Sequence, residues 1–286
     1  MSTNGAPVVR LDHGVVATND LGLSIVFLTQ VLGADFRRLV NANLRGLNRE
    51  VPEMAFFKLA NHHGFGYALQ GQPIPKPVRP MEGPVWGLEL NERSVEEAAE
   101  ILREHDVPVE GPVEYPASSP IAGSLWLTEP GDFVFELSVR REDQRCSDPG
   151  QGYLGLCRLS HVRLEVTDLA QAEDWYRNTL GLVDADQVPG DDDQLTLAIA
   201  ETGQLFILRQ VPEMTQRSHY SRGPHVDVKV AIGDYDEFVS RLTNVERYWG
   251  PFGDRIPWHE PDMQTVYFYD PFGNRLQVGE NREHPH

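Results

Sequence analysis

Residues 265–281, TVYFYDPFGNRLQVGEN, decide the fold, because they read as a strand, a tight turn and a second strand. The residues on either side of the turn are mostly Val, Phe, Tyr and Leu, which favour extended structure. Between them, DPFGN (270–274) has the composition of a turn. Tyr267 and Gln277 place hydrogen-bonding side chains on the two arms. The stretch therefore predicts a β-hairpin that carries two candidate functional residues.

This hairpin has a counterpart earlier in the chain, and so do other segments. Residues 125–137, LWLTEPGDFVFEL, match residues 266–278 at an offset of 141. Residues 11–33, a predicted strand and helix, match residues 159–181 at an offset of 148. Residues 83–90, a predicted strand that is followed by a helix, match residues 223–230 at an offset of 140. A long-period duplication of this kind predicts a repeated architecture.

Each half of the chain contains two strand–helix–strands units, which predicts an α+β fold. We expect two tandem domains, each built of two βαβββ modules that form a curled, partly open mixed β-barrel. The expected domains are residues 8–140 and 157–281. The join, 140–157, is charged and contains Gly and Pro without periodicity. The repeat leaves open whether modules pair within a half or across the halves.

Composition excludes some functions. The 286 residues have a formal net charge of −18, so no basic surface is expected for nucleic acid or an anionic membrane. No apolar run reaches the roughly 18 residues of a membrane span, and the N-terminus lacks the pattern of a signal peptide. Only Cys146 and Cys157 occur, which predicts a reducing, cytoplasmic location rather than a disulfide framework.

A histidine near the start of the first strand of each half and a D-P-x-G-N-R strand turn at the end resemble the vicinal oxygen chelate superfamily. This superfamily contains glyoxalases, bleomycin-resistance proteins and extradiol dioxygenases. The resemblance covers about residues 8–281 and is strongest to the two-domain catechol 2,3-dioxygenase type. It implies one active barrel, in the C-terminal domain, and an N-terminal domain without a metal. It also implies association into a homo-oligomer.

The resemblance assigns roles residue by residue. The two histidine ligands of iron(II) fall on His161 and His225, and the third ligand position falls on Gln277, where the family has a Glu. The Tyr that hydrogen-bonds the substrate falls on Tyr267, and a further histidine of the site falls on His259. The implied metal site is therefore His161, His225 and Gln277, with Tyr267 and His259 as catalytic residues.

Gln277 departs from the family pattern at its third ligand. An amide oxygen brings no charge, so iron(II) would be bound more weakly, and Mn(II), Zn(II) or Ni(II) become alternatives. Glu280 is a possible carboxylate, although it points to the other face of a regular strand. The first half has His13, Val85 and Glu136 at the matching positions.

The way the modules pair changes these ligand sets. Pairing across the halves would assemble His13, His225 and Gln277 in one barrel. It would bring Glu136 near His161 in the other.

The sequence supports three functions. The first is an extradiol-type ring-cleaving dioxygenase that acts on a catechol-like aromatic and O₂ through iron(II), with Gln277 in place of the Glu ligand. The second is a glyoxalase-type isomerase or lyase that uses a non-iron divalent metal. The third is a metal-free protein that binds a small molecule.

Overall fold

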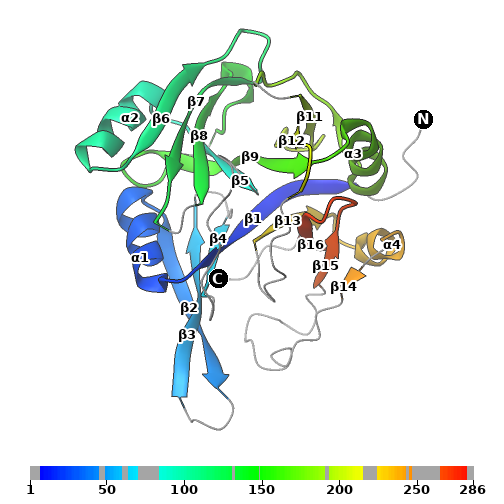
Figure 1. Cartoon of the computed structure of the whole chain (residues 1–286), viewed down its shortest axis with the longest axis horizontal. Helices are drawn as coiled ribbons and strands as arrows, with labels where there is room; N and C mark the ends of the chain where they lie inside the picture. Colours follow the sequence, from blue (N-terminus) through cyan, green and yellow to red (C-terminus); the bar gives the residue numbers. More distant parts are fainter. Residues whose placement is uncertain are drawn as a thin grey trace.

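The computed structural model describes residues 7–44, 49–59, 64–69, 84–130, 133–147, 149–190, 193–214, 224–242, 245–246 and 265–281. These residues form four consecutive βαβββ modules, coloured from blue to red along the chain in Figure 1. Module 1 contains β1 (Val8–Thr18), α1 (Leu21–Val26, continued by a π-helical turn, Phe27–Val31), β2 (Asp35–Leu44), β3 (Arg49–Lys58) and β4 (Gly64–Leu69). Module 2 contains β5 (Val85–Leu90), α2 (Val95–Glu104), β6 (Val109–Glu114), β7 (Ile121–Thr128) and β8 (Val134–Arg140).

The second half repeats this order after a short 3₁₀ turn, Glu142–Gln144. Module 3 contains β9 (Leu156–Val166), α3 (Leu169–Trp175, continued by a π-helical turn, Tyr176–Leu180), β10 (Val183–Asp184), β11 (Gln194–Ala198) and β12 (Leu205–Gln210). Module 4 contains β13 (His225–Val230), α4 (Tyr235–Ser240), β14 (Val245–Glu246), β15 (Thr265–Tyr269) and β16 (Arg275–Glu280). The predicted hairpin is thus β15 and β16.

Helices α1, α2 and α3 begin where the sequence supplies a capping side chain. Asp20 and Asp168, at matching positions of the repeat, each accept a hydrogen bond of 2.9 Å from a backbone N–H of the first helical turn. Ser94 and Glu97 form a reciprocal capping box at the start of α2. After the π-helical turns, Gly33 and Gly181 both take φ of 73°, which favours glycine and ends each helix.

The strands form two open sheets, and each sheet combines one module from each half. Sheet A has the order β14-β15-β16-β13-β1-β4-β3-β2, from modules 4 and 1. Sheet B has the order β10-β11-β12-β9-β5-β8-β7-β6, from modules 3 and 2. Both mix parallel and antiparallel pairs, since β1 runs antiparallel to β13 but parallel to β4.

The α+β class with curled, partly open mixed sheets is confirmed within the described residues. Of the two pairings that the repeat allowed, the structure has the one across the halves. Each sheet therefore draws on both 8–140 and 157–281, and these ranges are units of the sequence repeat.

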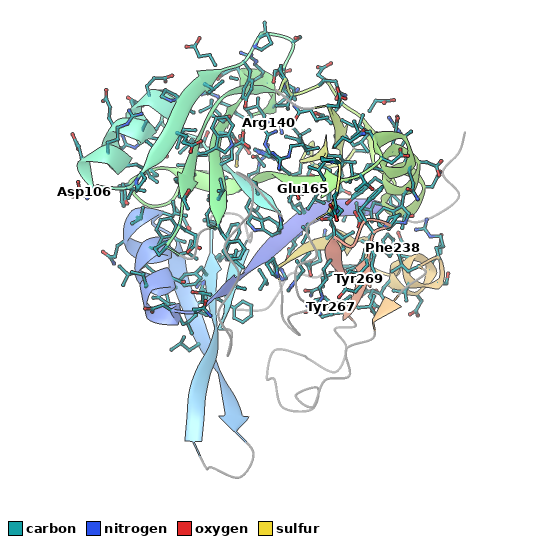
Figure 2. All side chains as sticks on the ribbon, viewed as in Figure 1. Asp106, Arg140, Glu165, Phe238, Tyr267 and Tyr269 are labelled. Atoms are coloured by element: carbon teal, nitrogen blue, oxygen red, sulfur yellow. The ribbon has the colours of Figure 1, made fainter. Side chains whose placement is uncertain are left out.

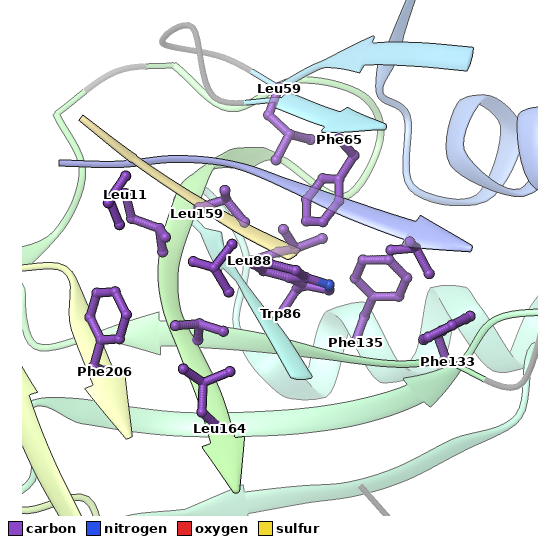
Figure 3. Packing of buried hydrophobic residues seen from close by; sticks show 14 of the residues in the cluster. Leu11, Leu59, Phe65, Trp86, Leu88, Phe133, Phe135, Leu159, Leu164 and Phe206 are labelled. Atoms are coloured by element: carbon purple, nitrogen blue, oxygen red, sulfur yellow. The ribbon is translucent and has the colours of Figure 1, made fainter. Parts of the chain in front are cut away.

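One hydrophobic core joins the two sheets (Figure 3). Phe65 of β4 contacts Trp86 of β5 and Phe135 of β8, with ring centroids 5.8 and 5.3 Å apart. Gly14 on β1 makes room for this cluster, because a Cβ there would lie 2.8 Å from the Trp86 ring. Gln204 adds a polar link, since its amide nitrogen donates to main-chain oxygens of both β1 and β9.

The described part of the chain contains no helix that is both long and apolar enough to cross a membrane.

Candidate metal centre

A row of polar side chains crosses four adjacent strands of sheet A. His13 on β1 is the register partner of Asp227 on β13, and Asp227 is the partner of Gln277 on β16. Gln277 in turn is the partner of Tyr267 on β15, which Figure 2 labels. Because register partners share a face of a sheet, these four side chains lie on one face. The strand neighbours of Asp227, Gln277 and Tyr267 are apolar and enter the core on the other face: Val226, Val228, Leu276, Val278, Val266 and Phe268.

A β-bulge places a second acidic residue beside this row. The register between β1 and β13 shifts between Leu11 and His13, so Asp12 and His13 together oppose Asp227. The Nδ1 of His13 lies 2.9 Å from Oδ2 of Asp12 and its Nε2 lies 3.9 Å from Oδ2 of Asp227. In the neutral tautomer that donates from Nδ1 to Asp12, Nε2 of His13 carries the lone pair and faces Asp227.

His225 lies on the same face, two residues before Asp227 on β13. Its ring centroid is 6.1 Å from that of His13 and 5.1 Å from that of Tyr267. His225 therefore lies between the histidine of β1 and the tyrosine of β15. It is 4 % exposed, whereas the His13 side chain is 22 % exposed, which leaves the site in contact with solvent.

Lys229 compensates the charge of the two aspartates. Its Nζ lies 2.8 Å from Oδ1 of Asp227 and 3.6 Å from Oδ2 of Asp12. Burial raises the pKa of Asp227, and Lys229 and His13 offset only part of that effect. The pKa of Asp12 is also subject to burial, but Lys229, His13 and Arg10 hold it well below its usual range. Burial by itself lowers the pKa of Lys229. The two carboxylates outweigh burial and raise the pKa above its ordinary value, so Lys229 stays protonated.

The donor geometry fits a divalent metal ion. Among the described residues, Asp12, His13 and Asp227 form the one cluster of at least three His, Cys, Asp or Glu with ligand atoms within 4.8 Å of one another. Two ligands about 2.1 Å from an ion lie at most roughly 4.2 Å apart, which the separation between His13 and Asp227 satisfies. The hydrogen bond from His13 to Asp12 is the carboxylate contact that metal-bound histidines usually make.

Sheet B contains an equivalent row with different residues. His161 on β9 is the register partner of Gly87 on β5, and Gly87 is the partner of Glu136 on β8. Glu136 in turn is the partner of Trp126 on β7. Gly87 thus stands where sheet A has Asp227. A Cβ on Gly87 would lie 2.1 Å from the His161 ring, so the ring crosses this glycine. It reaches Glu136 with Nε2 at 3.0 Å from Oε2.

Arg163 supplies the cation in sheet B. Its Nε and Nη2 donate to the two oxygens of Glu136 at 2.6 and 3.1 Å, a bidentate pair. Burial alone would raise the pKa of Glu136, but Arg163 and His161 hold it far below its usual range. Burial lowers the pKa of His161 despite Glu136, and its Nδ1 lies within hydrogen-bond distance of the Ser160 hydroxyl, at 2.8 Å. Both ring nitrogens of His161 are therefore engaged within the protein.

The structure brings together only part of the sequence-predicted site. His225, Gln277 and Tyr267 share the face of sheet A, as described above. His161 lies in sheet B, held by Ser160 and Glu136, so the structure does not unite it with His225. His259 lies outside the described residues.

The two carboxylates considered as replacements for the missing Glu ligand, Glu280 and Glu136, lie in different sheets. Glu280 accepts a hydrogen bond from the backbone N–H of Gly233 at 3.1 Å, away from the histidines. Glu136 does lie beside His161, as pairing across the halves implies.

The sequence reasoning missed Asp12 and Asp227. A signal for Asp227 exists in HVDVKV (225–230), because charged residues within a fully buried strand require partners. No comparable signal reveals the bulge at Asp12.

Comparisons with known proteins identify a family match in the second half of the chain. Residues 158–278 match the family model described as Glyoxalase/Bleomycin resistance protein/Dioxygenase superfamily. This part of the chain is a domain of that superfamily.

The whole chain resembles solved structures in fold. A "putative dioxygenase" from Bacillus subtilis is 13 % identical, with a TM-score of 0.68 over 98 % of this chain and 87 % of the other.

Glyoxalase I from Zea mays is 16 % identical, with a TM-score of 0.60 over 95 % of this chain and 92 % of the other. At such identities the likeness establishes the vicinal oxygen chelate fold alone. A comparison with curated protein sequences found no match. Members of this superfamily bind divalent metals and small-molecule substrates, which is consistent with a cluster of metal-ligand type on sheet A.

Proposed function

We propose that the chain is a metal-dependent enzyme whose centre lies on sheet A. Its ligands are His13 and Asp227, which belong to the cluster described above, and His225, which lies outside that cluster on the same face; Gln277 lies beside them. The observation that carries the proposal is the orientation of His13, whose Nδ1 is held by Asp12 while Nε2 is directed at Asp227. Lys229 contacts Oδ1 of Asp227 and leaves Oδ2 towards His13, which suits a carboxylate that binds an ion through one oxygen.

Two histidines and one carboxylate are the ligand set of non-haem iron(II) oxygenases. We therefore propose an extradiol-type ring-cleaving dioxygenase that acts on a catechol-like aromatic. Iron(II), when bound, supplies open positions for the two substrate oxygens and O₂. In this scheme Asp12 fixes the tautomer of His13. Tyr267 lies next to His225 and donates a hydrogen bond to a substrate oxygen.

A glyoxalase-type isomerase is the second candidate, and Gln277 favours it. The amide of Gln277 is adjacent to Asp227 in register and offers a further, uncharged oxygen donor. Such a site suits Zn(II), Ni(II) or Mn(II), and the reaction needs no O₂. The two candidates share the same residues of sheet A and differ in the metal and in oxygen consumption.

Reconstitution separates these candidates. Protein loaded anaerobically with iron(II) should consume O₂ with a member of a catechol panel and form a yellow ring-fission product. Iron-loaded protein that is inert to the whole panel would contradict the dioxygenase. Turnover with Zn(II) or Ni(II) and without O₂ uptake would favour the isomerase. Failure to bind Fe(II), Zn(II) or Mn(II) would leave the metal-free binding protein.

Histidine variants locate the site. His13→Ala and His225→Ala should abolish metal binding measured by titration calorimetry. His161→Gln should retain it, whereas the sequence-derived ligand set predicts its loss. The matched control is His105→Ala, because His105 is an exposed histidine at the end of α2. Circular dichroism should show that each variant is folded.

A further inference from the structure

A second candidate binding site lies in sheet B and is independent of the metal centre. It is a cavity of about 720 Å³, a volume in the range of small-molecule sites. Arg140 of β8, Arg158 of β9, and Ala198 and Leu205 of β11 and β12 form its wall, and the 142–145 segment covers one side. In Figure 2 Arg140 lies within the curve of sheet B, between β8 and the β11–β12 pair.

Arg140 is buried and makes no ion pair in the described part of the chain, although Glu89 and Asp143 act against the effect of burial on its pKa. It is 2 % exposed, and its Nη2 donates only to neutral oxygens, those of the Gln144 amide and the Gly203 carbonyl, at 2.7 and 3.1 Å. Its Nε and Nη1 donate to no hydrogen-bond acceptor in the described part of the chain. Burial lowers the pKa of Arg140 to about 10, so it stays charged at neutral pH. A buried cation with unused donors favours a bound anion.

The neighbouring charges are already engaged. Arg158 donates to Glu89 at 2.6 Å and to the carbonyl of Gln144 at 3.0 Å. The other oxygen of Glu89 accepts from the backbone N–H of Cys146 at 2.7 Å. Glu89 is thus committed to Arg158 and the 142–145 segment, and within the described residues it makes no ion pair with Arg140.

The rest of the lining restricts the charge and shape of the ligand. The apolar residues Pro120, Ala185, Ala198 and Leu205 line the cavity and suit an apolar body. Three aspartates, at positions 143, 184 and 186, also line it and offset the charge of Arg140, Arg145 and Arg158, so a ligand with several negative charges is disfavoured. The lining therefore favours a single negative charge on a compact apolar molecule.

We propose that this cavity binds a small organic monocarboxylate, with its carboxylate at the Arg140 guanidinium and its apolar part over Ala198 and Leu205. The site lies on the face of sheet B on which Arg163 pairs with Glu136. It needs no ion in sheet A, so loss of the proposed enzyme activity does not affect it.

Benzoate is the probe, with benzamide as its neutral isostere and inorganic phosphate as the multiply charged anion. Calorimetric titration of the full chain should show saturable binding of benzoate, at least about tenfold stronger than that of benzamide, since hydrogen bonds to charged groups are worth roughly 1.5–3 kcal/mol. Phosphate should bind more weakly than benzoate. Absence of benzoate binding, equal binding of benzamide, or stronger binding of phosphate would each overturn the proposal.

Variants test the location. Arg140→Gln should weaken benzoate binding at least about tenfold by removing the charged donor. Ala198→Phe should block it by filling the cavity from the opposite wall. Arg103→Gln is the control, because Arg103 lies on α2, does not line the cavity and donates to the carbonyl of Gly111 at 2.9 Å. If Arg140→Gln does not fold, Ala198→Phe decides alone, and unchanged affinity in that variant refutes the site.

Discussion

Replacing Arg163 with methionine removes the cation that compensates Glu136 inside sheet B. The substitution breaks contacts of 2.6 and 3.1 Å and leaves a carboxylate with 0 % side-chain exposure without its arginine partner. Removing one partner of a buried ion pair costs about 3–5 kcal/mol. For a chain of 286 residues, that corresponds to a fall in Tm of roughly 5–8 °C. Methionine keeps most of the side-chain volume, so packing contributes little to the loss.

Urea unfolding and calorimetry of the full chain measure this cost. The control is Arg177→Met, because Arg177 pairs with Glu173 and Asp184, which are 45 % and 91 % exposed. Exposed pairs contribute about 0–1 kcal/mol, so this variant should unfold almost like the wild type. Combining Arg163→Met with Glu136→Leu should recover much of the loss, since no buried charge remains. Equal effects of the Arg163 and Arg177 substitutions would refute the buried pair.

Three further predictions concern single residues. Gly87→Ala should destabilise the chain by about 1–3 kcal/mol in urea unfolding, because its Cβ would meet the His161 ring. Gly22→Ala on α1, where the Cβ would make only an ordinary contact of 3.4 Å with Oδ1 of Asp20, should be neutral or stabilise by up to about 1 kcal/mol, and matching effects at both glycines would contradict the close approach. The folded-state pKa of Glu136 lies below its ordinary 4.5, so its stabilisation is present above that pH and is lost as pH falls below it. Unfolding free energies measured down to about pH 3 should show this loss in the wild type and less of it in Glu136→Gln, and identical profiles would be evidence against it. Gln277→Glu should tighten Mn(II) binding in calorimetry by adding a charged oxygen, and an unchanged affinity would remove Gln277 from the site.

Much of the fold is predictable from local chemistry. The 3.6-residue pattern, the caps at Asp20 and Asp168, and the glycines after the helices define the modules. The turn at 270–274 defines the last hairpin. These features depend on residues close together in the chain, and the structure contains each of them.

The pairing of modules depends on contacts between distant strands. Strands β1 and β9 share one sequence pattern, so β13 and β5 are each plausible neighbours of either. The sequence therefore allows both pairings, and packing of the assembled sheets selects between them. This selection separates His161 from His225, although the repeat gives His161 and His13 the same local sequence.

The candidate site was only partly predictable for the same reason. Gln277 and Tyr267 are register partners within one hairpin, so their common face follows from the turn. Asp227 joins them only through pairing of β13 with β16, and Asp12 only through the bulge opposite β13. Neither the bulge nor the space above Gly87 has a distinct signature in a single sequence.

Anomalous diffraction from crystals soaked in Mn(II) tests the central claim most directly. The proposed site predicts one ion per chain, about 2.2 Å from Nε2 of His13 and from Oδ2 of Asp227, next to His225. It also predicts no peak beside His161, where Arg163 already provides the positive charge. A peak bound to His161, or no peak at Asp227 in fully soaked crystals, would contradict a metal centre on sheet A.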